Sequence, residues 1–148
     1  MSTTHARPSR PRALCTALRH GRKMLCRQIA ALAAGPDDAL AHGFVALVAA
    51  VEATFRHEEL IMEMLGYVQL REHRAENAVV LSALHHVLPD IEQGDLPLAR
   101  QVLVALDAVL ALHRLSADLA LAVAPPAAGV RARGHAARAT LHVAMHRR

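Results

Sequence analysis

The chain has 148 residues, of which 53% are hydrophobic, and this is enough apolar material for one domain with a packed core. A disordered chain is therefore excluded. Aromatic residues make up only 2% of the chain, and Ala and Leu outnumber the β-branched residues. This composition argues against a β-sandwich and predicts an all-α fold.

The formal net charge of +4 is unevenly distributed along the chain. Seven of the seventeen Lys and Arg residues lie in residues 1–36, five lie in residues 119–148, and all thirteen acidic residues lie between these ends. Either the basic ends fold onto the acidic centre, or they present a basic surface to an acidic protein, a lipid or a nucleic acid. The ends contain no aromatic residue that could stack on bases, so we expect an acidic protein partner rather than nucleic acid.

The sequence gives no indication of a membrane-spanning or secretory segment. Its longest uncharged runs are either shorter than the roughly 20 apolar residues of a membrane span or broken by proline. The basic N-terminal segment is not followed by the apolar core of a signal peptide. We therefore expect a cytoplasmic protein without a membrane span.

Apolar residues recur at three- and four-residue steps in four segments, which is typical of amphipathic helices. The predicted helices cover residues 13–34, 37–65, 70–88 and 97–123. Helix-breaking residues separate them, namely Gly35-Pro36, Gly66 and Pro89, and Asp37 or Asp38 is suited to cap the second helix.

Four helices with short connections predict an antiparallel up-down-up-down four-helix bundle over residues 13–123. Residues 1–12 are expected to form a flexible basic arm, and residues 124–148 a basic C-terminal extension. A weak apolar stripe in this extension is compatible with a short basic fifth helix.

Three of the predicted helices carry polar residues that can meet inside a bundle. These residues are Glu58, His73, His113 and Asp118. Two imidazole nitrogens and two carboxylates projecting inward form an ordinary ligand set for Fe(II) or Mn(II). Taken singly, each residue is better explained as an exposed polar side chain.

The spacing of these residues is that of a known motif. One block runs from Phe55-Arg56-His57-Glu58-Glu59 through Met62 and Gly66-Tyr67 to His73, and His113 to Asp118 forms a second block, His-x-x-x-x-Asp. Both resemble blocks of the hemerythrin family, the first being similar to His-Phe-x-x-Glu-Glu…Met…Gly-Tyr…His-x-x-x-His. The stretch from Arg22 to Ile29 is similar to the first-helix block, which in the family begins with a ligand His. The resemblance spans about residues 19–123.

The resemblance implies a four-helix bundle that binds O2 at two non-haem irons, held by five histidines and two bridging carboxylates. This chain retains both carboxylate positions, Glu58 and Asp118, but Arg22, Thr54 and Asn77 stand at three of the histidine positions. Arg22 and Thr54 belong to the same iron, and neither residue type is a useful metal ligand. We therefore expect at most one metal ion.

That ion would be held by Glu58, His73, His113, Asp118 and the side-chain oxygen of Asn77. A single non-haem iron with open positions can bind or sense O2 or a related diatomic molecule. No substrate pocket or acid–base pair can be read from the sequence, so no enzymatic activity is expected.

The alternative is a metal-free scaffold that acts as a protein-interaction module through its basic ends. Two buried carboxylates without a metal would be costly, and the Arg22 guanidinium bonded to Glu58 and Asp118 would offset that cost. Among the other histidines, His57 is the one that could replace a lost ligand. His85 and His86 lie too far from His73, and His5, His20, His42, His135, His142 and His146 are expected to face solvent.

Overall fold

The computed structural model describes the backbone of residues 10–123 and the side chains of residues 10–114. The chain divides into two compact units, residues 1–114 and residues 115–148, and the packing described below belongs to the first. Four α-helices follow one another: α1 (Arg10–Ala34), α2 (Asp37–Met64), α3 (Leu70–Glu92) and α4 (Leu96–Val123). No strand occurs within residues 10–123, so the predicted all-α fold is confirmed.

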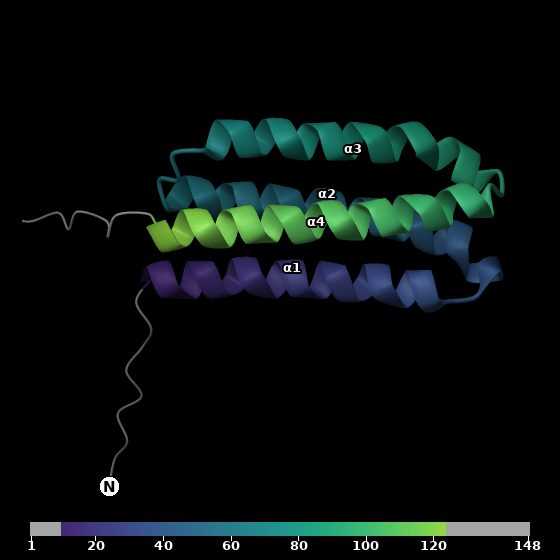
Figure 1. Cartoon of the computed structure of the whole chain (residues 1–148), viewed down its shortest axis with the longest axis horizontal. Helices are drawn as coiled ribbons and strands as arrows, with labels where there is room; N and C mark the ends of the chain where they lie inside the picture. The colour runs from purple at the N-terminus through teal and green to yellow at the C-terminus, as the bar shows by residue number, and fades with distance from the viewer. Residues whose placement is uncertain (1–9, 124–148) are drawn as a thin grey trace, which may run out of the picture. The chain divides into compact units, whose positions relative to one another are not determined.

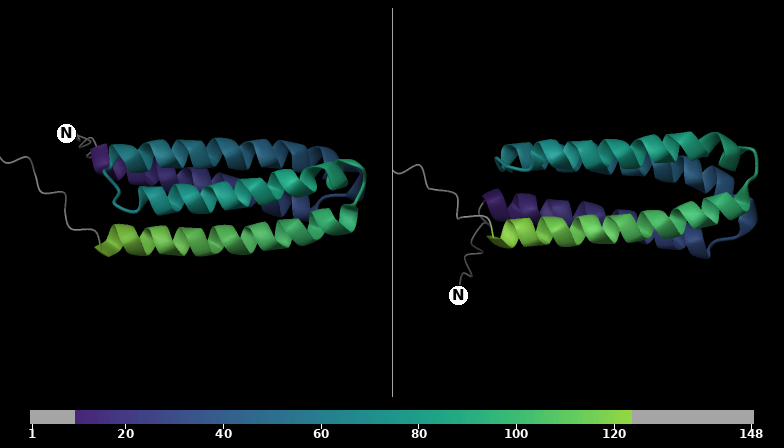
Figure 2. Two further views of the ribbon diagram at one scale, coloured as in Figure 1. Left: turned by 90° about the horizontal axis from the view of Figure 1, so that it is seen from above. Right: turned by 45° about the horizontal axis from the view of Figure 1, so that its top comes forward.

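The four helices run side by side, and their connections alternate between the two ends of the bundle (Figure 1). Two further views show the same antiparallel arrangement (Figure 2). The predicted up-down-up-down bundle is therefore confirmed. Its core consists of apolar residues from all four helices, and the fully buried ones include Ile29, Leu40, Phe44, Ile91 and Leu103.

Glycine ends two of the helices in the way that the sequence predicts for Gly66. Gly66 has φ +66° and Gly94 has φ +102°, a left-handed conformation that costs glycine little. After α2, the N–H of Gly66 donates to the carbonyl of Glu63, and the N–H of Tyr67 donates to that of Met62. This pair of bonds is the Schellman motif, and it satisfies carbonyls that a helix end leaves free.

Two predicted helix boundaries differ from the structure by three residues or more. The first helix begins at Arg10 rather than residue 13, so residues 10–12 are helical and not part of an arm. The third helix does not end at Pro89, because α3 continues through Pro89 to Glu92 and bends near this end (Figure 1). Proline removes one helical hydrogen bond, but the Pro89 carbonyl still accepts a bond from the N–H of Gln93.

The predicted cap of the second helix is also corrected. Pro36, in an extended conformation, is the capping position, and no side chain caps the helix. Asp37 and Asp38 instead lie in the first turn, where their negative charges favour the positive end of the helix dipole. The predicted fifth helix and residues 1–9 lie outside the described part of the chain.

The outer faces of α2, α3 and α4 retain apolar residues. An open groove of about 300 Å³ between α3 and α4 is lined by apolar residues alone, among them Val79, Val87, Val102 and Val109. By length and hydropathy, Asp37–Met64 and Leu96–Arg114 could each cross a membrane, although core helices of soluble proteins pass the same criterion. The expected absence of a membrane span therefore stays a prediction.

Candidate functional site

Each helix contributes a polar side chain to one cluster inside the bundle. The cluster consists of Arg22 from α1, Glu58 from α2, His73 from α3 and His113 from α4. The side chains of Glu58, His73 and Asn77 are buried, because these residues share a face with the apolar residues of their helices. Three of the five predicted metal ligands, Glu58, His73 and His113, therefore lie in the cluster, and Asn77 is buried on the same helix as His73.

Arg22 and Glu58 form a two-pronged ion pair at the centre of the cluster. Arg22 Nε donates to Glu58 Oε1 at 2.5 Å, and Nη2 donates to Glu58 Oε2 at 3.2 Å. Arg22 Nη1 also donates to the backbone carbonyl of His113 at 3.3 Å, so the guanidinium bridges α1, α2 and α4. Paired, charge-assisted hydrogen bonds of this kind are the strongest that side chains make.

The charge state of Glu58 depends on this pairing. Burial by itself raises the pKa of the Glu58 carboxyl, but the neighbouring His73 and Arg22 favour the carboxylate and lower it below the ordinary value of 4.5. Glu58 is therefore ionised at neutral pH although only 3% of its surface is exposed.

His73 lies next to the ion pair without completing a hydrogen bond. Its Nε2 is 3.5 Å from Glu58 Oε2, and no other described group bonds to this nitrogen, which is fully buried. The His73 ring is tilted 49° to that of His113, with 6.0 Å between the ring centroids. The two imidazoles thus approach each other across α3 and α4, as the sequence predicts.

Asn77 is held by a residue that the sequence does not single out. Its Nδ2 donates to Glu59 Oε1 at 3.0 Å, whereas its Oδ1 is buried and has no hydrogen-bond partner in the described part of the chain. Glu59 follows Glu58 on α2 and is only half-buried. Glu59 directly follows the inward-facing Glu58, and this was the one sequence signal for its contact with Asn77. The sequence does not indicate which of the two acids turns toward α3.

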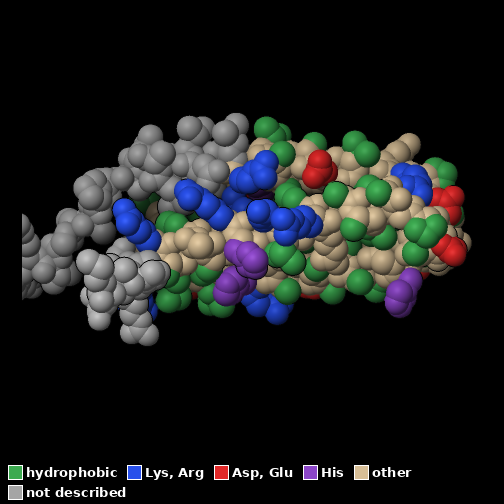
Figure 3. All heavy atoms as spheres, turned by 90° about the horizontal axis from the view of Figure 1, so that it is seen from below, with side chains coloured by type: hydrophobic (Ala, Val, Ile, Leu, Met, Phe, Trp, Pro, Cys, Tyr) green, Lys and Arg blue, Asp and Glu red, His purple; other side chains and the backbone are tan. Residues whose placement is uncertain are grey.

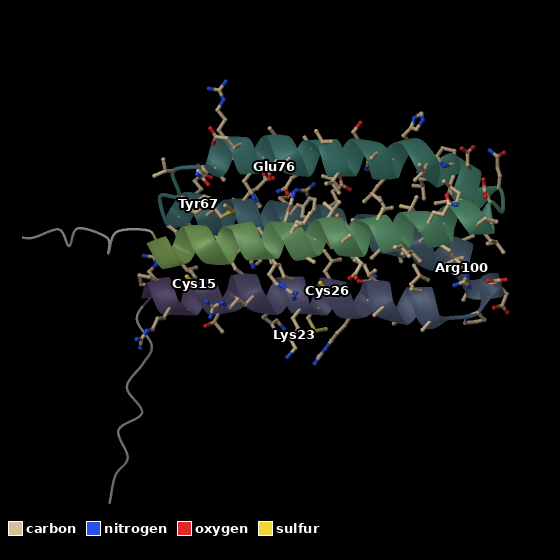
Figure 4. The ribbon with its side chains drawn as sticks, viewed as in Figure 1. Cys15, Lys23, Cys26, Tyr67, Glu76 and Arg100 are labelled. Atoms are coloured by element: carbon tan, nitrogen blue, oxygen red, sulfur yellow. The ribbon has the colours of Figure 1, made fainter. Side chains whose placement is uncertain are left out.

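His113 has a carboxylate neighbour that sequence reasoning also missed. Its Nε2 lies 3.5 Å from Glu76 Oε2 of α3, and the Glu76 side chain is exposed (Figure 4). Burial lowers the pKa of His113 below the ordinary value of 6.5, and this effect exceeds the opposing attraction of Glu76. His113 is therefore an uncharged imidazole at neutral pH.

The remaining predicted positions whose side chains are described lie outside the contact network. Thr54 donates its hydroxyl to the carbonyl of Ala50 at 2.7 Å, within its own helix. Asp118 lies on α4, but beyond the described side chains. His57 is exposed, as are His20, His42, His85 and His86, which confirms the prediction for His20 and His42.

The described side chains do not fit a metal ion in this arrangement. Within residues 10–114, no three His, Cys, Asp or Glu side chains gather closely enough to hold one. Both oxygens of Glu58 are bonded to a guanidinium, which would also repel a cation. A cavity of about 10 Å³ between Arg22, Phe55 and His113 has room for a single water molecule.

Comparison with known proteins adds no constraint on this cluster. No family model, no curated protein sequence and no solved structure matches the chain.

Proposed function

We propose that this chain is a hemerythrin-like bundle that works without a di-iron centre, as a cytoplasmic protein-interaction module and not as an enzyme. The observation that carries the proposal is the pairing of Arg22 with both oxygens of Glu58. By the resemblance, Arg22 stands where the family has a ligand to one iron. Its guanidinium brings a positive charge to the same carboxylate that an ion would neutralise.

The electrostatics of the bundle interior support a role for Arg22 in place of an ion. A buried carboxylate needs a compensating positive charge and hydrogen-bond donors, and Arg22 supplies both. A lysine would supply the charge but not the planar two-pronged contact. The bundle can thus keep its helix packing without iron, which leaves its outer surface as the part available for function.

A second candidate function is a single metal ion that binds O2 or a related diatomic molecule. The observation that favours it is the pair of buried atoms without partners, His73 Nε2 and Asn77 Oδ1. Both belong to residues that the resemblance assigns to the second iron, together with His113 and Asp118. An iron at this place would supply an open coordination position for a diatomic ligand.

Metal content separates the two candidates. The protein is purified without chelator, its metal content per chain is measured, and its absorption spectrum is recorded before and after exposure to air. The metal-free module predicts well under one ion per chain and a melting temperature that a strong chelator does not change. One tightly bound ion per chain would favour the second candidate, and two ions with oxo-to-iron absorption bands would contradict both.

His73→Ala provides an independent test, with His85→Ala as its matched control. Both positions lie on α3, but His73 is buried in the cluster and His85 is exposed. If a metal is bound, His73→Ala loses both the ion and the chelator-sensitive part of the stability. If none is bound, His73→Ala loses only packing and its melting temperature remains unaffected by chelator.

A further inference from the structure

The outward face of α1 carries a row of cations, which we call the α1 basic row: Arg12, Lys23 and Arg27. All three side chains are exposed, and on a regular helix they fall within about 60° of one another over a length of about 22 Å. The buried residues of α1, which are Leu18, Leu25 and Ile29, lie on the opposite side of the helix. The row therefore faces away from the bundle.

The outward position of the α1 basic row can be followed in two views of the molecule (Figure 3, Figure 4). Figure 3 shows Lys and Arg side chains gathered over the left and central part of the face on which α1 lies, with few acidic side chains among them. Lys23 extends outward from α1 (Figure 4). Arg19 belongs to the same side of the helix but makes an interaction of its own, so the proposal is built on the other three residues.

The row is not neutralised by the part of the chain that the structure describes. None of the ion pairs within residues 10–114 involves Arg12, Lys23 or Arg27, and α1 contains no acidic residue. Lys23 and Arg27 are four residues apart, and like charges at this spacing destabilise a helix. Arg10 and Arg12 lie in the first turn, where the helix dipole also disfavours positive charge.

An acidic partner would offset the unfavourable interactions of Arg12, Lys23 and Arg27. We propose that the α1 basic row is a docking surface for an acidic amphipathic helix of a partner protein. The proposal rests on the proposed function, because it names the surface and the partner class of that interaction module. Lys23 and Arg27 repeat at about 6 Å along the axis, and carboxylates four residues apart on a second helix repeat at the same distance.

The surroundings of the row favour a protein helix over other anionic partners. Met24, which is 49% exposed, lies beside Lys23 and offers an apolar contact to a partner side chain. Binding of single-stranded nucleic acid without sequence reading relies on aromatic residues for base stacking, and α1 has none. A membrane surface would need several apolar anchors, whereas Met24 is the one large hydrophobic residue of α1 that is markedly exposed.

The test is the binding of the full-length chain to a labelled helical peptide with Glu at positions i, i+4, i+7 and i+11. The test variant is Lys23→Glu/Arg27→Glu. The matched control is Arg56→Glu/Arg71→Glu, which changes the net charge equally at exposed positions on α2 and α3. We expect the test variant to weaken binding at least about tenfold, the control less than about threefold, and added salt to weaken wild-type binding.

Two further measurements make the outcome specific. A peptide of the same composition with its Glu residues in scrambled order should bind several-fold more weakly, because the repeat and not the net charge is recognised. Thermal unfolding of Lys23→Glu/Arg27→Glu should be nearly unchanged, since the substitution exchanges one exposed pair of like charges four residues apart for another.

Equal losses in both variants, or equal binding of the two peptides, would overturn the proposal. The proposal would also fail if the protein bound duplex DNA or phosphatidylserine vesicles through the α1 basic row but did not bind the helical peptide. These outcomes are independent of metal content, so a failure here is distinguishable from a failure of the proposed metal-free state.

Discussion

The two halves of the bundle core are built from different chemistry. The half near the α1–α2 and α3–α4 connections is filled by apolar side chains, among them Leu40, Phe44, Ile91 and Leu103. The half near the α2–α3 connection contains the Arg22–Glu58 pair with its two imidazoles. Apolar packing needs matching volumes, whereas each group of the polar half needs one particular partner. Apolar packing alone therefore does not explain the composition of the polar half, which requires a functional or an evolutionary explanation.

The largest effect should come from breaking the ion pair on one side. Glu58→Ala leaves the Arg22 guanidinium, whose side chain is only 14% exposed, without its partner. We expect the free energy of unfolding to fall by about 3–5 kcal/mol, measured by urea denaturation.

Replacing both partners by apolar residues is the control for this effect. Arg22→Met/Glu58→Leu removes the pair without leaving a charge, and should be neutral or stabilising by about 1–4 kcal/mol relative to wild type. A double variant as unstable as Glu58→Ala would contradict the view that pairing, rather than packing, governs this half.

In the apolar half, a single truncation should cost a comparable or slightly smaller amount. Leu103 is 1% exposed within the core, so Leu103→Ala removes buried surface and leaves a cavity. The expected loss is about 2–5 kcal/mol, measured in the same denaturation experiment. Unlike the ion pair, this residue should tolerate Leu103→Met with a loss below about 1.5 kcal/mol.

Acid should weaken the polar half selectively. The pKa of His113 is lowered by burial, so its contribution is complete above pH 6.5 and decreases as the pH falls below that value. The pKa of Glu58 is also lowered, because Arg22 and His73 outweigh the effect of burial, and its contribution decreases below pH 4.5.

Unfolding measured against pH should therefore show stability falling below pH 6.5 and falling more steeply below pH 4.5. His113→Gln should remove the upper part of this decrease, and Glu58→Gln should reduce the lower part. If the pH dependence of His113→Gln matched that of wild type, the assignment to His113 would be wrong.

The smallest effect is expected on the outer apolar surface. Val79 lines the groove between α3 and α4 and is 70% exposed. Val79→Lys should change the free energy of unfolding by less than about 0.5 kcal/mol. A larger loss in the isolated protein would show that the groove is covered in solution.

Hydrophobic periodicity was sufficient to predict the four helices, because each must turn one apolar face toward the core. It did not predict that α3 continues past Pro89, since the cost of one missing hydrogen bond is offset by the packing of Ile91, which is fully buried. Local sequence signals cannot weigh a backbone defect against a tertiary contact.

The candidate site was predicted in part. The inward positions of Glu58, His73 and Asn77, and the pairing of Arg22 with Glu58, follow from helical spacing together with the resemblance. The bond from Asn77 to Glu59 and the approach of Glu76 to His113 do not, because they depend on rotamers and on the rotation of α3 relative to its neighbours. The place of the Asp118 side chain stays a prediction.

Arg100 has a consequence for the order in which the bundle assembles. Its guanidinium donates to the carbonyls of Ala33 and Gly35 and to Asp37 Oδ1, at the end of α1 and the start of α2 (Figure 4). The last turn of α1 is thus completed by a residue of α4, more than sixty positions later in the chain. During synthesis, α1 and α2 emerge from the ribosome long before this donor exists. Their shared turn should therefore remain open to solvent and to proteases until α4 has been made and has packed against them.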